Sequence, residues 1–571
     1  MDWKQVPETV LRTDVLIIGG GAAGMWAAKR LKENDPGLDV LMVDKGPESW
    51  GGLMRLAGGD FAAVLPGESV DDWVKDVVYY WDGLCEQDVM EDIFSQSYDR
   101  LLDYKNLGCE FLEDENGNLR GVPQRGLDHC RLYPAKLKGT GGQNMAEAMV
   151  KEMVRLGVRR MSRTLVTDLV KDGDRVIGAV GFHSITGEYY IFQARAVIVA
   201  CGNASWKPGY NSNTSTGEWV DMCFQAGVEL RNFETLTVMN APKLFFWEGQ
   251  AIYLALGGRF VNALGEPFMD KYSPVLGANT DNNYITRAMA IEIRNGRGPI
   301  YLDLSQIKPE DMVFVKPQTG NQMMNYEKLL AEGIDFFHDK NIEFIPQVQL
   351  TLGGAATAPD GGTGVEGLYV CGRSRSLDYV YMGGFGLSST AITGYITGNA
   401  VADYLRTASA GREVSVGEAA GLKEKLYSPM GDAGLTPKQV LIKVQNLMSH
   451  YDVCLLKSAE SLTAALGELD RLRTEELPRM YAADPHYLLK YKEVEGIFLL
   501  TELYLRASLL RQESRGSHYR LDYPKRNDKD FLGWIVQRQG ADGSVVQRVK
   551  PVPLARYKHP VDRFYSDNFT F

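Results

Sequence analysis

The sequence predicts an α/β fold in which a Rossmann-like domain is interrupted by an α+β segment and followed by a helical domain. Three observations lead to this prediction. At 13–34 an apolar strand runs into a glycine-rich turn and then into an alanine-rich helix. Two further apolar strands, within 194–205 and 365–376, run into glycine much later in the chain. Residues 415–515 carry leucines at spacings of three and four, as the buried faces of helices do.

The first glycine-rich turn has the spacing of a dinucleotide site. Gly19-x-Gly21-x-x-Gly24 follows the apolar strand Val15 to Ile18. These glycines make a tight turn, let the backbone approach a pyrophosphate and allow the helix to pack closely on the strand. A second strand, "DVLMVDKG", ends at Asp44, about 20 residues after Gly24, where a carboxylate can accept hydrogen bonds from a ribose diol. Together these features predict a dinucleotide site.

Three later stretches favour FAD over NAD as the dinucleotide. They are "SWGGLMRLAGGDFAA", "ARAVIVACGNAS" and "VEGLYVCGRSRS", the last followed by the glycine- and serine-rich "MGGFGLSSTAITG". Because these parts of one cofactor domain lie far apart in the sequence, an insertion must separate them, and we expect it to cap the substrate. The expected division is an FAD-binding domain at 1–227 and 346–412, a capping domain at 228–345, a helical domain at 413–525 and a tail at 526–571.

Charge and composition argue against several classes of protein. A net charge of −11 at pH 7 argues against an obligate nucleic-acid binder. The sequence shows neither a signal-peptide pattern nor about 18 consecutive uncharged apolar residues, so we expect a cytoplasmic protein without an integral membrane segment. The seven cysteines are scattered without a CxxC pair, so no iron–sulfur cluster or zinc site is expected. Any one-electron relay would therefore lie on another chain.

Five strings carry a resemblance to a known family: "GGGAAG", "GGRFVNALGEPF", "TRAMAIEIRNGRGPIYLDL", "GLYVCG" and "ESRGSHYRLDYPKRND". Through them the chain resembles, from about residue 10 to 550, the flavoprotein superfamily of succinate dehydrogenase, fumarate reductase, L-aspartate oxidase and the adenylylsulfate reductase alpha subunit. The resemblance implies an FAD-dependent oxidoreductase that exchanges a hydride at flavin N5 with a small-molecule substrate. It also implies an iron–sulfur or other electron-transfer protein as partner.

The resemblance assigns a role to Arg287. In the dicarboxylate members, the arginine of the string matched here by "TRAMAIEIRNGRG" exchanges the proton beside the flavin. A guanidinium with a pKa above about 12 is a poor acid unless it lies in a dry site. The alternative, in which Arg287 forms an ion pair that bridges two domains, stays open.

Departures from the family pattern concern the substrate. The stretch "NFETLTVMNAPK" lacks the histidine of the dicarboxylate members, Gln349 stands at the position of their second histidine, and their carboxylate-clamping arginine falls at Gly384 or Phe385. Without these groups two carboxylates lose their charge-assisted hydrogen bonds. We therefore do not expect succinate, fumarate or aspartate as the substrate.

Two more departures concern the flavin and the pocket around it. Gly52 occupies the position of the flavin-linking histidine, so FAD is expected to be non-covalent, and Arg373 stands where the family has glutamate after "CG". Arg373 could face the pyrophosphate, a substrate anion or solvent. Lys243 and Trp247 follow the lost histidine string and, with Tyr379 and Tyr381, suggest a larger pocket lined by aromatic residues.

The sequence thus predicts an enzyme that reduces or forms an activated C=C bond in a bulky or conjugated substrate. The expected catalytic residues are Arg287, Gln349, Lys243, Trp247 and Tyr381. The expected FAD contacts are Gly19, Gly21, Ala23, Gly24, Asp44, Lys45, Ser49, Gly51, Gly52, Gly58, Gly59, Val166, Ala200, Gly202, Arg373, Ser389 and Thr390. Two alternatives remain: an adenylylsulfate reductase-like subunit that acts on a sulfur substrate with an iron–sulfur partner, and a flavin electron-transfer subunit without substrate chemistry.

Overall fold

A computed structural model gives the fold of the chain. It describes residues 3–47, 52–136, 141–207, 215–244, 253–254, 256–311, 326–339, 341–409 and 411–571. Ser49, Gly51 and Trp247 of the predicted site lie outside these residues. Within the described ranges, no helix has both the length and the apolar composition that crossing a bilayer requires.

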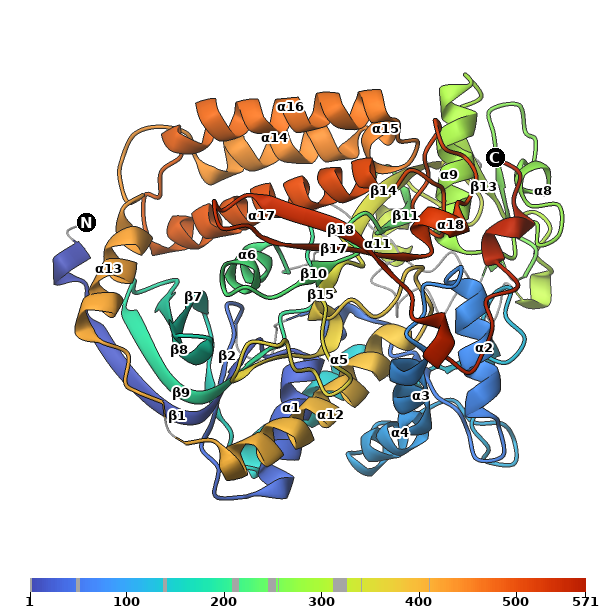
Figure 1. Ribbon diagram of the computed structural model, residues 1–571. Helices are drawn as coiled ribbons and strands as arrows, with labels where there is room; N and C mark the ends of the chain where they lie inside the picture. The colour runs from blue at the N-terminus through green and yellow to red at the C-terminus, as the bar shows by residue number, and fades with distance from the viewer. Residues whose placement is uncertain are drawn as a thin grey trace.

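A seven-stranded sheet forms the centre of the predicted FAD-binding domain, with the order β6-β2-β1-β9-β8-β7 and with β16 paired to β9 (Figure 1). Strand β1 pairs in parallel with β2 and β9, and β7 and β8 form the predicted antiparallel hairpin. The strands are β1 (Glu8–Ile18), β2 (Val40–Val43), β6 (Arg159–Met161), β7 (Thr164–Asp172), β8 (Arg175–His183), β9 (Tyr189–Val199) and β16 (Leu368–Val370).

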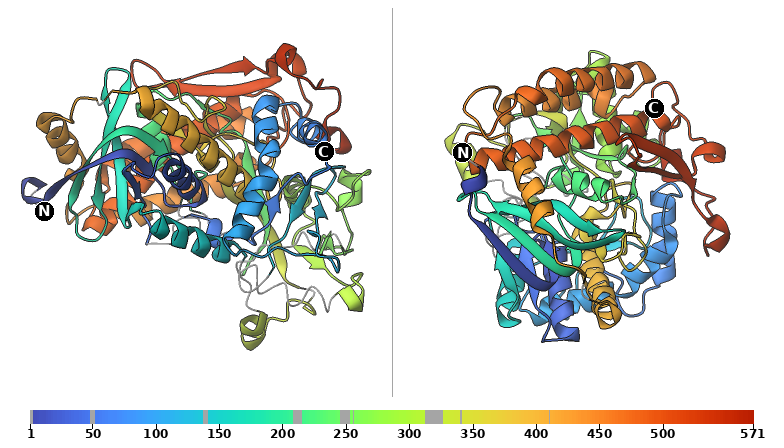
Figure 2. Two further views of the ribbon diagram at one scale, coloured as in Figure 1. Left: turned by 90° about the horizontal axis from the view of Figure 1, so that it is seen from below. Right: turned by 60° about the vertical axis from the view of Figure 1, so that its left-hand side comes forward.

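Helices cover both faces of this sheet, because the apolar residues of β1 alternate between two cores. Val15 and Ile17 pack with α1 (Ala22–Asn34), α5 (Gly141–Arg155) and α12 (Phe385–Thr407). Leu16 and Ile18 belong to the core that contains α6 (Glu218–Gln225) and the long helix α17 (Pro485–Leu510). Figure 2 shows the two layers from other directions.

A second unit follows in the predicted capping segment. Its antiparallel sheet has the order β11-β14-β13-β12, and α9 (Asn282–Arg294) packs against it. Aromatic side chains fill much of its core, among them Tyr253, Phe260 and Phe344. The strands are β11 (Leu236–Pro242), β12 (Arg259–Val261), β13 (Ile300–Asp303) and β14 (Glu343–Thr351), and the short helices are α8 (Met269–Tyr272) and α11 (Tyr326–Ala331).

The predicted helical segment contains α13 (Val416–Tyr427), α14 (Pro437–Ser449), α15 (Tyr451–Cys454), α16 (Ala459–Glu475) and α17. Capping boxes begin α13, α14 and α16, so the first free N–H groups of each helix are bonded to side chains. Smaller elements beside the FAD-binding domain are β3 (Phe61–Ala62), β4 (Val122–Pro123), β5 (Arg131–Tyr133), α2 (Val70–Tyr80), α3 (Gln87–Ser95), α4 (Ser97–Asn106) and the 3-10 turns η2 (Met54–Leu56) and η4 (Gly372–Ser374).

The segment 526–571 is more than a tail. It contains α18 (Asp528–Phe531) and a hairpin of β17 (Gly533–Gln539) and β18 (Val545–Pro551). Strand β17 pairs with β10 (Leu230–Arg231), which pairs with β15 (Gly354–Ala355) at the foot of the capping unit. Farther on, Phe569 stacks on Tyr284 of α9 with ring centroids 3.8 Å apart. The segment therefore ties the capping unit to the rest of the molecule.

Candidate active site

A cavity of about 280 Å³ lies where the FAD-binding sheet, α6, β14 and the start of α12 meet. Most of the predicted site residues line it. These are Gly19, Gly21, Ala23, Asp44, Lys45, Gly52, Gly58, Gly59, Val166, Ala200, Gly202, Gln349, Arg373, Tyr381 and Thr390. Gly24, Ser389, Lys243 and Arg287 lie outside the lining.

The glycine-rich turn forms a cradle at the N-terminus of α1. Gly19 has φ +112°, and a Cβ there would lie 2.4 Å from the Ala200 carbonyl oxygen. A Cβ on Gly24 would lie 2.1 Å from the Gly19 carbonyl oxygen, so this residue serves the packing of helix against strand. Gly21, in contrast, faces open space within the cavity. Free N–H groups at the start of a helix bind anions, so the residues present fit the pyrophosphate of FAD.

One end of the cavity is closed by charged groups. The Asp44 carboxylate accepts hydrogen bonds from the backbone N–H of Gly20, at 2.7 Å, and of Gly46, at 2.6 Å. Lys45 Nζ contacts Glu218 on α6 and lies 3.1 Å from Glu493 Oε1 on α17. Burial opposes the charged form of Lys45, but these two glutamates hold its pKa above the ordinary value. No sequence pattern points to Glu218 or Glu493, because neither belongs to the nucleotide motif.

The opposite end can be traced along α12. Gly372 and Gly394 pack against Ala23 of α1, which places this part of α12 beside the glycine cradle. From there the helix runs back to its first residues, and Gly384 at its start packs against the backbone of β3. The Ala62 N–H donates to the Gly384 carbonyl at 3.2 Å. The glycine stretch that precedes β3 therefore lies at the end of the cavity farthest from Asp44, where the flavin ring would bind.

Beside this end lie the side chains that would face a substrate. Gln349, at the end of β14, lines the cavity together with Tyr381, and so does Arg373. The Arg373 guanidinium is paired with the buried Asp378 carboxylate, and its Nε donates to Asn203 Oδ1 at 3.4 Å. Its Nη1 has no hydrogen-bond partner among the described residues. Arg373 therefore faces the cavity as one half of a neutral pair, with one N–H group left for a bound molecule.

The predicted aromatic lining is wrong for the described residues. Tyr379 is buried against Trp81 in a core, and Lys243 is exposed and pairs with Glu343 Oε2 at 2.7 Å. The aromatic residues of the capping segment that are described, namely Phe233, Tyr253, Phe260, Tyr272 and Tyr284, are buried in cores. Among the described residues, the aromatic side chains in the lining are Tyr381 and, at the Asp44 end, Trp219. The neighbouring lining at the substrate end is aliphatic instead, with Leu350, Leu352 and Met382.

The structure places Arg287 in neither of its two expected settings. Its guanidinium faces the rings of Tyr284, Tyr519 and Phe571, with centroids 4.9, 4.5 and 4.8 Å away. Nη2 donates to the Gly516 carbonyl at 2.9 Å, and no carboxylate in the described parts of the chain pairs with it. Burial lowers the pKa of Arg287. The prediction that this side chain reaches the flavin does not match its position, which is inside an aromatic box away from the cavity.

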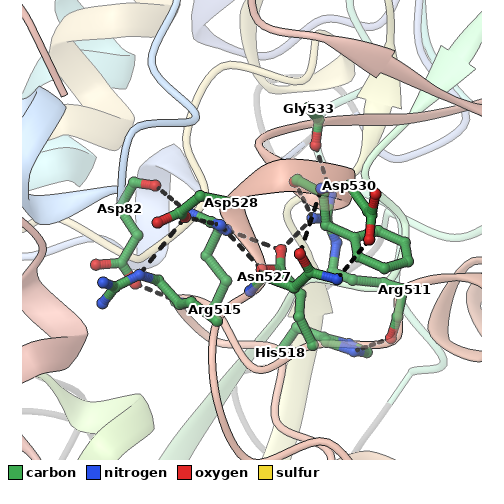
Figure 3. Close-up of polar contacts among 12 residues, drawn as sticks. Asp82, Arg511, Arg515, His518, Asn527, Asp528, Asp530 and Gly533 are labelled. Atoms are coloured by element: carbon green, nitrogen blue, oxygen red, sulfur yellow. Dashed lines mark hydrogen bonds and ion pairs between the residues drawn. The ribbon is translucent and has the colours of Figure 1, made fainter.

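Behind Arg287, the string "ESRGSHYRLDYPKRND" forms a buried network of charges (Figure 3). Arg511 Nε donates to Glu234 Oε1 at 2.8 Å, and Arg511 and Arg515 both bond to Glu513 at 2.8 Å. His518 is fully buried and its Nε2 lies 3.2 Å from the Arg511 carbonyl oxygen. Each carboxylate here has an arginine partner, so the string joins the base of the capping unit to α17 and has a structural role.

Comparisons with known proteins agree with this site. Residues 14–384 match the family model described as FAD binding domain, and residues 442–565 match the one described as fumarate reductase flavoprotein C-term. One of the subunits of the CoM/CoB fumarate reductase of Methanothermobacter marburgensis is 26% identical, covering 90% of this chain and 94% of that protein. The L-aspartate oxidase of Pseudomonas aeruginosa is also 26% identical, covering 90% of this chain and 95% of that protein.

Solved structures show the same fold. The E. coli quinol fumarate reductase flavoprotein superposes with a TM-score of 0.86 at 22% identity, covering 96% of this chain and 98% of that one. Adenylylsulfate reductase from Archaeoglobus fulgidus superposes with a TM-score of 0.81 at 21% identity, covering 98% and 99%. The fold is shared across enzymes with different substrates, so the substrate must be inferred from the cavity. From the family match and the cradle that fits FAD, the chain belongs to the FAD-dependent oxidoreductases of the fumarate reductase and succinate dehydrogenase flavoprotein family.

Proposed function

We propose that the enzyme reduces, or forms, an activated C=C bond in a bulky or conjugated substrate that is not a dicarboxylate. The observation that carries the proposal is the state of Arg373. Among the described residues that line the substrate end of the cavity, Arg373 is the one cationic side chain, and Asp378 neutralises it. A single neutralised guanidinium cannot clamp two carboxylates, since each would need its own charge-assisted hydrogen bonds.

The remaining groups suit a neutral conjugated acceptor. Leu350, Leu352 and Met382 supply apolar surface, while the Gln349 amide can donate to a carbonyl oxygen. The unpaired Nη1 of Arg373 can do the same without bringing net charge. Such donors polarise a carbonyl conjugated with the C=C bond, which makes the β-carbon a better hydride acceptor.

FAD, when bound, supplies the hydride chemistry at N5. The chain holds it through the glycine cradle at Gly19 to Ala23, the Asp44 carboxylate and the glycines at 58 and 59. We propose that it is held without a covalent bond, because Gly52 lines the cavity where the resemblance places the flavin-linking histidine of covalent members. Several relatives are named as subunits of larger enzymes, and we propose an iron–sulfur or other electron-transfer protein as the partner of this chain.

The test is anaerobic photoreduction of the flavin-loaded protein, followed by mixing with candidate oxidants while the visible flavin absorbance is followed. The panel contains fumarate, conjugated enoates, enones, aryl-acrylates and adenylylsulfate, with saturated analogues as negative controls. We expect rapid reoxidation by a bulky conjugated compound and not by fumarate. Reoxidation by fumarate would refute the argument from Arg373, reoxidation by adenylylsulfate alone would favour a sulfur substrate, and no reoxidation at all would favour an electron-transfer subunit.

A further inference from the structure

We propose that Asp60 is the acid that exchanges the substrate proton in this enzyme, an inference that rests on the function proposed above. A proton donor is required because adding a hydride to one carbon of a C=C bond leaves negative charge on the other carbon or on the conjugated oxygen. Arg287, the donor predicted from the sequence, lies outside the cavity lining. The donor must therefore be found among the groups that face the cavity.

Asp60 is held at the substrate end by rigid surroundings. It follows the Gly58-Gly59 pair and precedes β3, and it lines the cavity. Gly59 has φ +92°, and a Cβ there would lie 2.7 Å from Gly141 and 2.8 Å from the Ala135 methyl group. The backbone on either side of Asp60 is thus fixed, by this packing before it and by the hydrogen bond from Ala62 to Gly384 after it. Such support holds a carboxyl in a defined direction, as proton transfer requires.

Asp60 differs from the other carboxylates of the described lining in having no partner. Asp44 accepts two backbone hydrogen bonds, Glu218 pairs with Lys45, and Asp378 pairs with Arg373. No hydrogen bond or ion pair joins Asp60 to another residue in the described ranges. A carboxyl without partners inside a cavity is free to bind a proton and to release it to a bound molecule.

The electrostatic setting agrees with this role. Burial raises the pKa of Asp60 to about 6. The charged and titratable groups nearest to it along the chain path are Arg373, Asp378 and Tyr381 at its end of the cavity and Tyr133 on β5, while Asp44, Lys45 and Glu218 lie at the opposite end. Bound flavin and substrate exclude water from this end, which moves the pKa farther upward. The carboxyl is then poised close to neutral pH, where a general acid works best.

The proposed step balances as follows in the direction of reduction. The substrate π bond breaks, one carbon gains a hydride from the reduced flavin, and the other gains the proton of the Asp60 carboxyl. Two C–H bonds form, the flavin is oxidised by two electrons, and the Asp60 carboxylate regains its proton from water. In the direction of dehydrogenation the carboxylate form accepts the proton. Because the acid form is needed, the rate of reduction should fall as the pH rises through the pKa of Asp60, and the rate of dehydrogenation should rise.

The experiment compares wild type with Asp60→Asn, Asp60→Glu and the control Asp221→Asn. Asp221 is also a half-buried carboxyl whose pKa is raised by burial, but it lies outside the lining and bonds to Gln225. Flavin content and visible absorbance are measured against pH, and single-turnover reoxidation is measured with the best compound of the panel. We expect all variants to bind FAD. We expect the wild type and Asp221→Asn to show a spectral titration at or above pH 6 that Asp60→Asn lacks.

In single turnover, Asp60→Asn should be slower by about 10²–10⁴-fold and independent of pH over this range. Asp60→Glu, which keeps the acid, should recover at least part of the rate. A titration that persists in Asp60→Asn, or an Asp60→Asn rate close to that of wild type, would overturn the role of Asp60 while the proposed function stands. Silence of the wild type toward the whole panel would overturn the proposed function and the proton transfer with it.

Discussion

Replacing Arg287 with alanine separates a structural role for this arginine from the proton transfer that its motif suggests. Contacts with the rings of Tyr284, Tyr519 and Phe571 are worth about 0.5–2 kcal/mol each. Leaving the Gly516 carbonyl unpaired costs a further ~1–3 kcal/mol. Since burial lowers the pKa of Arg287, removing its charge relieves part of the desolvation cost. We therefore expect the free energy of unfolding to fall by about 2–4 kcal/mol.

Thermal melting of the flavin-loaded protein measures this loss. For a cooperative unit of 571 residues it corresponds to a decrease in Tm of about 2–3 °C. The control is Arg294→Ala on the same helix, where a side chain that is 53% exposed pairs with Asp452 and contributes only about 0–1 kcal/mol. Turnover per bound flavin should stay near that of wild type in both variants. An Arg287→Ala protein that melts like the control but turns over about 10²-fold more slowly would refute the structural role and restore the proton transfer.

Two further predictions concern the cofactor end of the cavity. Gly24→Ala places a Cβ 2.1 Å from the Gly19 carbonyl oxygen, which forces the cradle to shift, so FAD affinity measured by fluorescence quenching of the apoprotein should fall by about 10- to 100-fold, whereas Gly421→Ala, with open space around it, should leave it unchanged. Burial opposes the charge of Glu493, yet Lys45 and Lys207 hold its pKa at about 2 against an ordinary 4.5, so its stabilisation is complete above pH 4.5 and is lost as the pH falls toward 2. Glu493→Gln should therefore lower the free energy of unfolding at neutral pH by about 3 kcal/mol and flatten its decline in acid, while Glu475→Gln at an exposed pair should do neither; equal acid sensitivity of the two variants would contradict the assignment.

The parts of the fold that the sequence predicts well depend on local interactions. The strand, turn and helix at 13–34 follow from the glycine spacing, and the hairpin of β7 and β8 turns at Asp172-Gly173. The helical segment follows from its leucine pattern. Segment 526–571 is predicted as a tail because its partner is distant. Strand β17 pairs with β10, which lies some 300 residues earlier, and no local pattern reports such a pairing.

The candidate site divides in the same way. Residues of the glycine cradle and Asp44 can be predicted because one short motif contains them and each has a distinct physical task. Glu218 and Glu493 cannot, since they reach Lys45 from two helices far apart in the sequence. Asp60 lies within the second glycine-rich stretch, but its lack of partners is a property of the folded chain alone. The prediction for the aromatic residues of the capping segment fails because hydrophobic side chains in such a segment serve its own core first.

Arg287 shows why a matching string does not fix the direction of a side chain. Residues five apart on an α-helix point about 140° away from each other. On α9, Asn282 faces β11, where its Oδ1 accepts from Asn240 Nδ2 at 3.2 Å, and Arg287 faces the segment that contains Gly516. No residue of α9 is in the described lining of the cavity. Because a proton must travel a short distance along a defined hydrogen bond, its source has to be on the cavity wall itself, and the wall at the substrate end is built from the loops around Asp60 and Arg373.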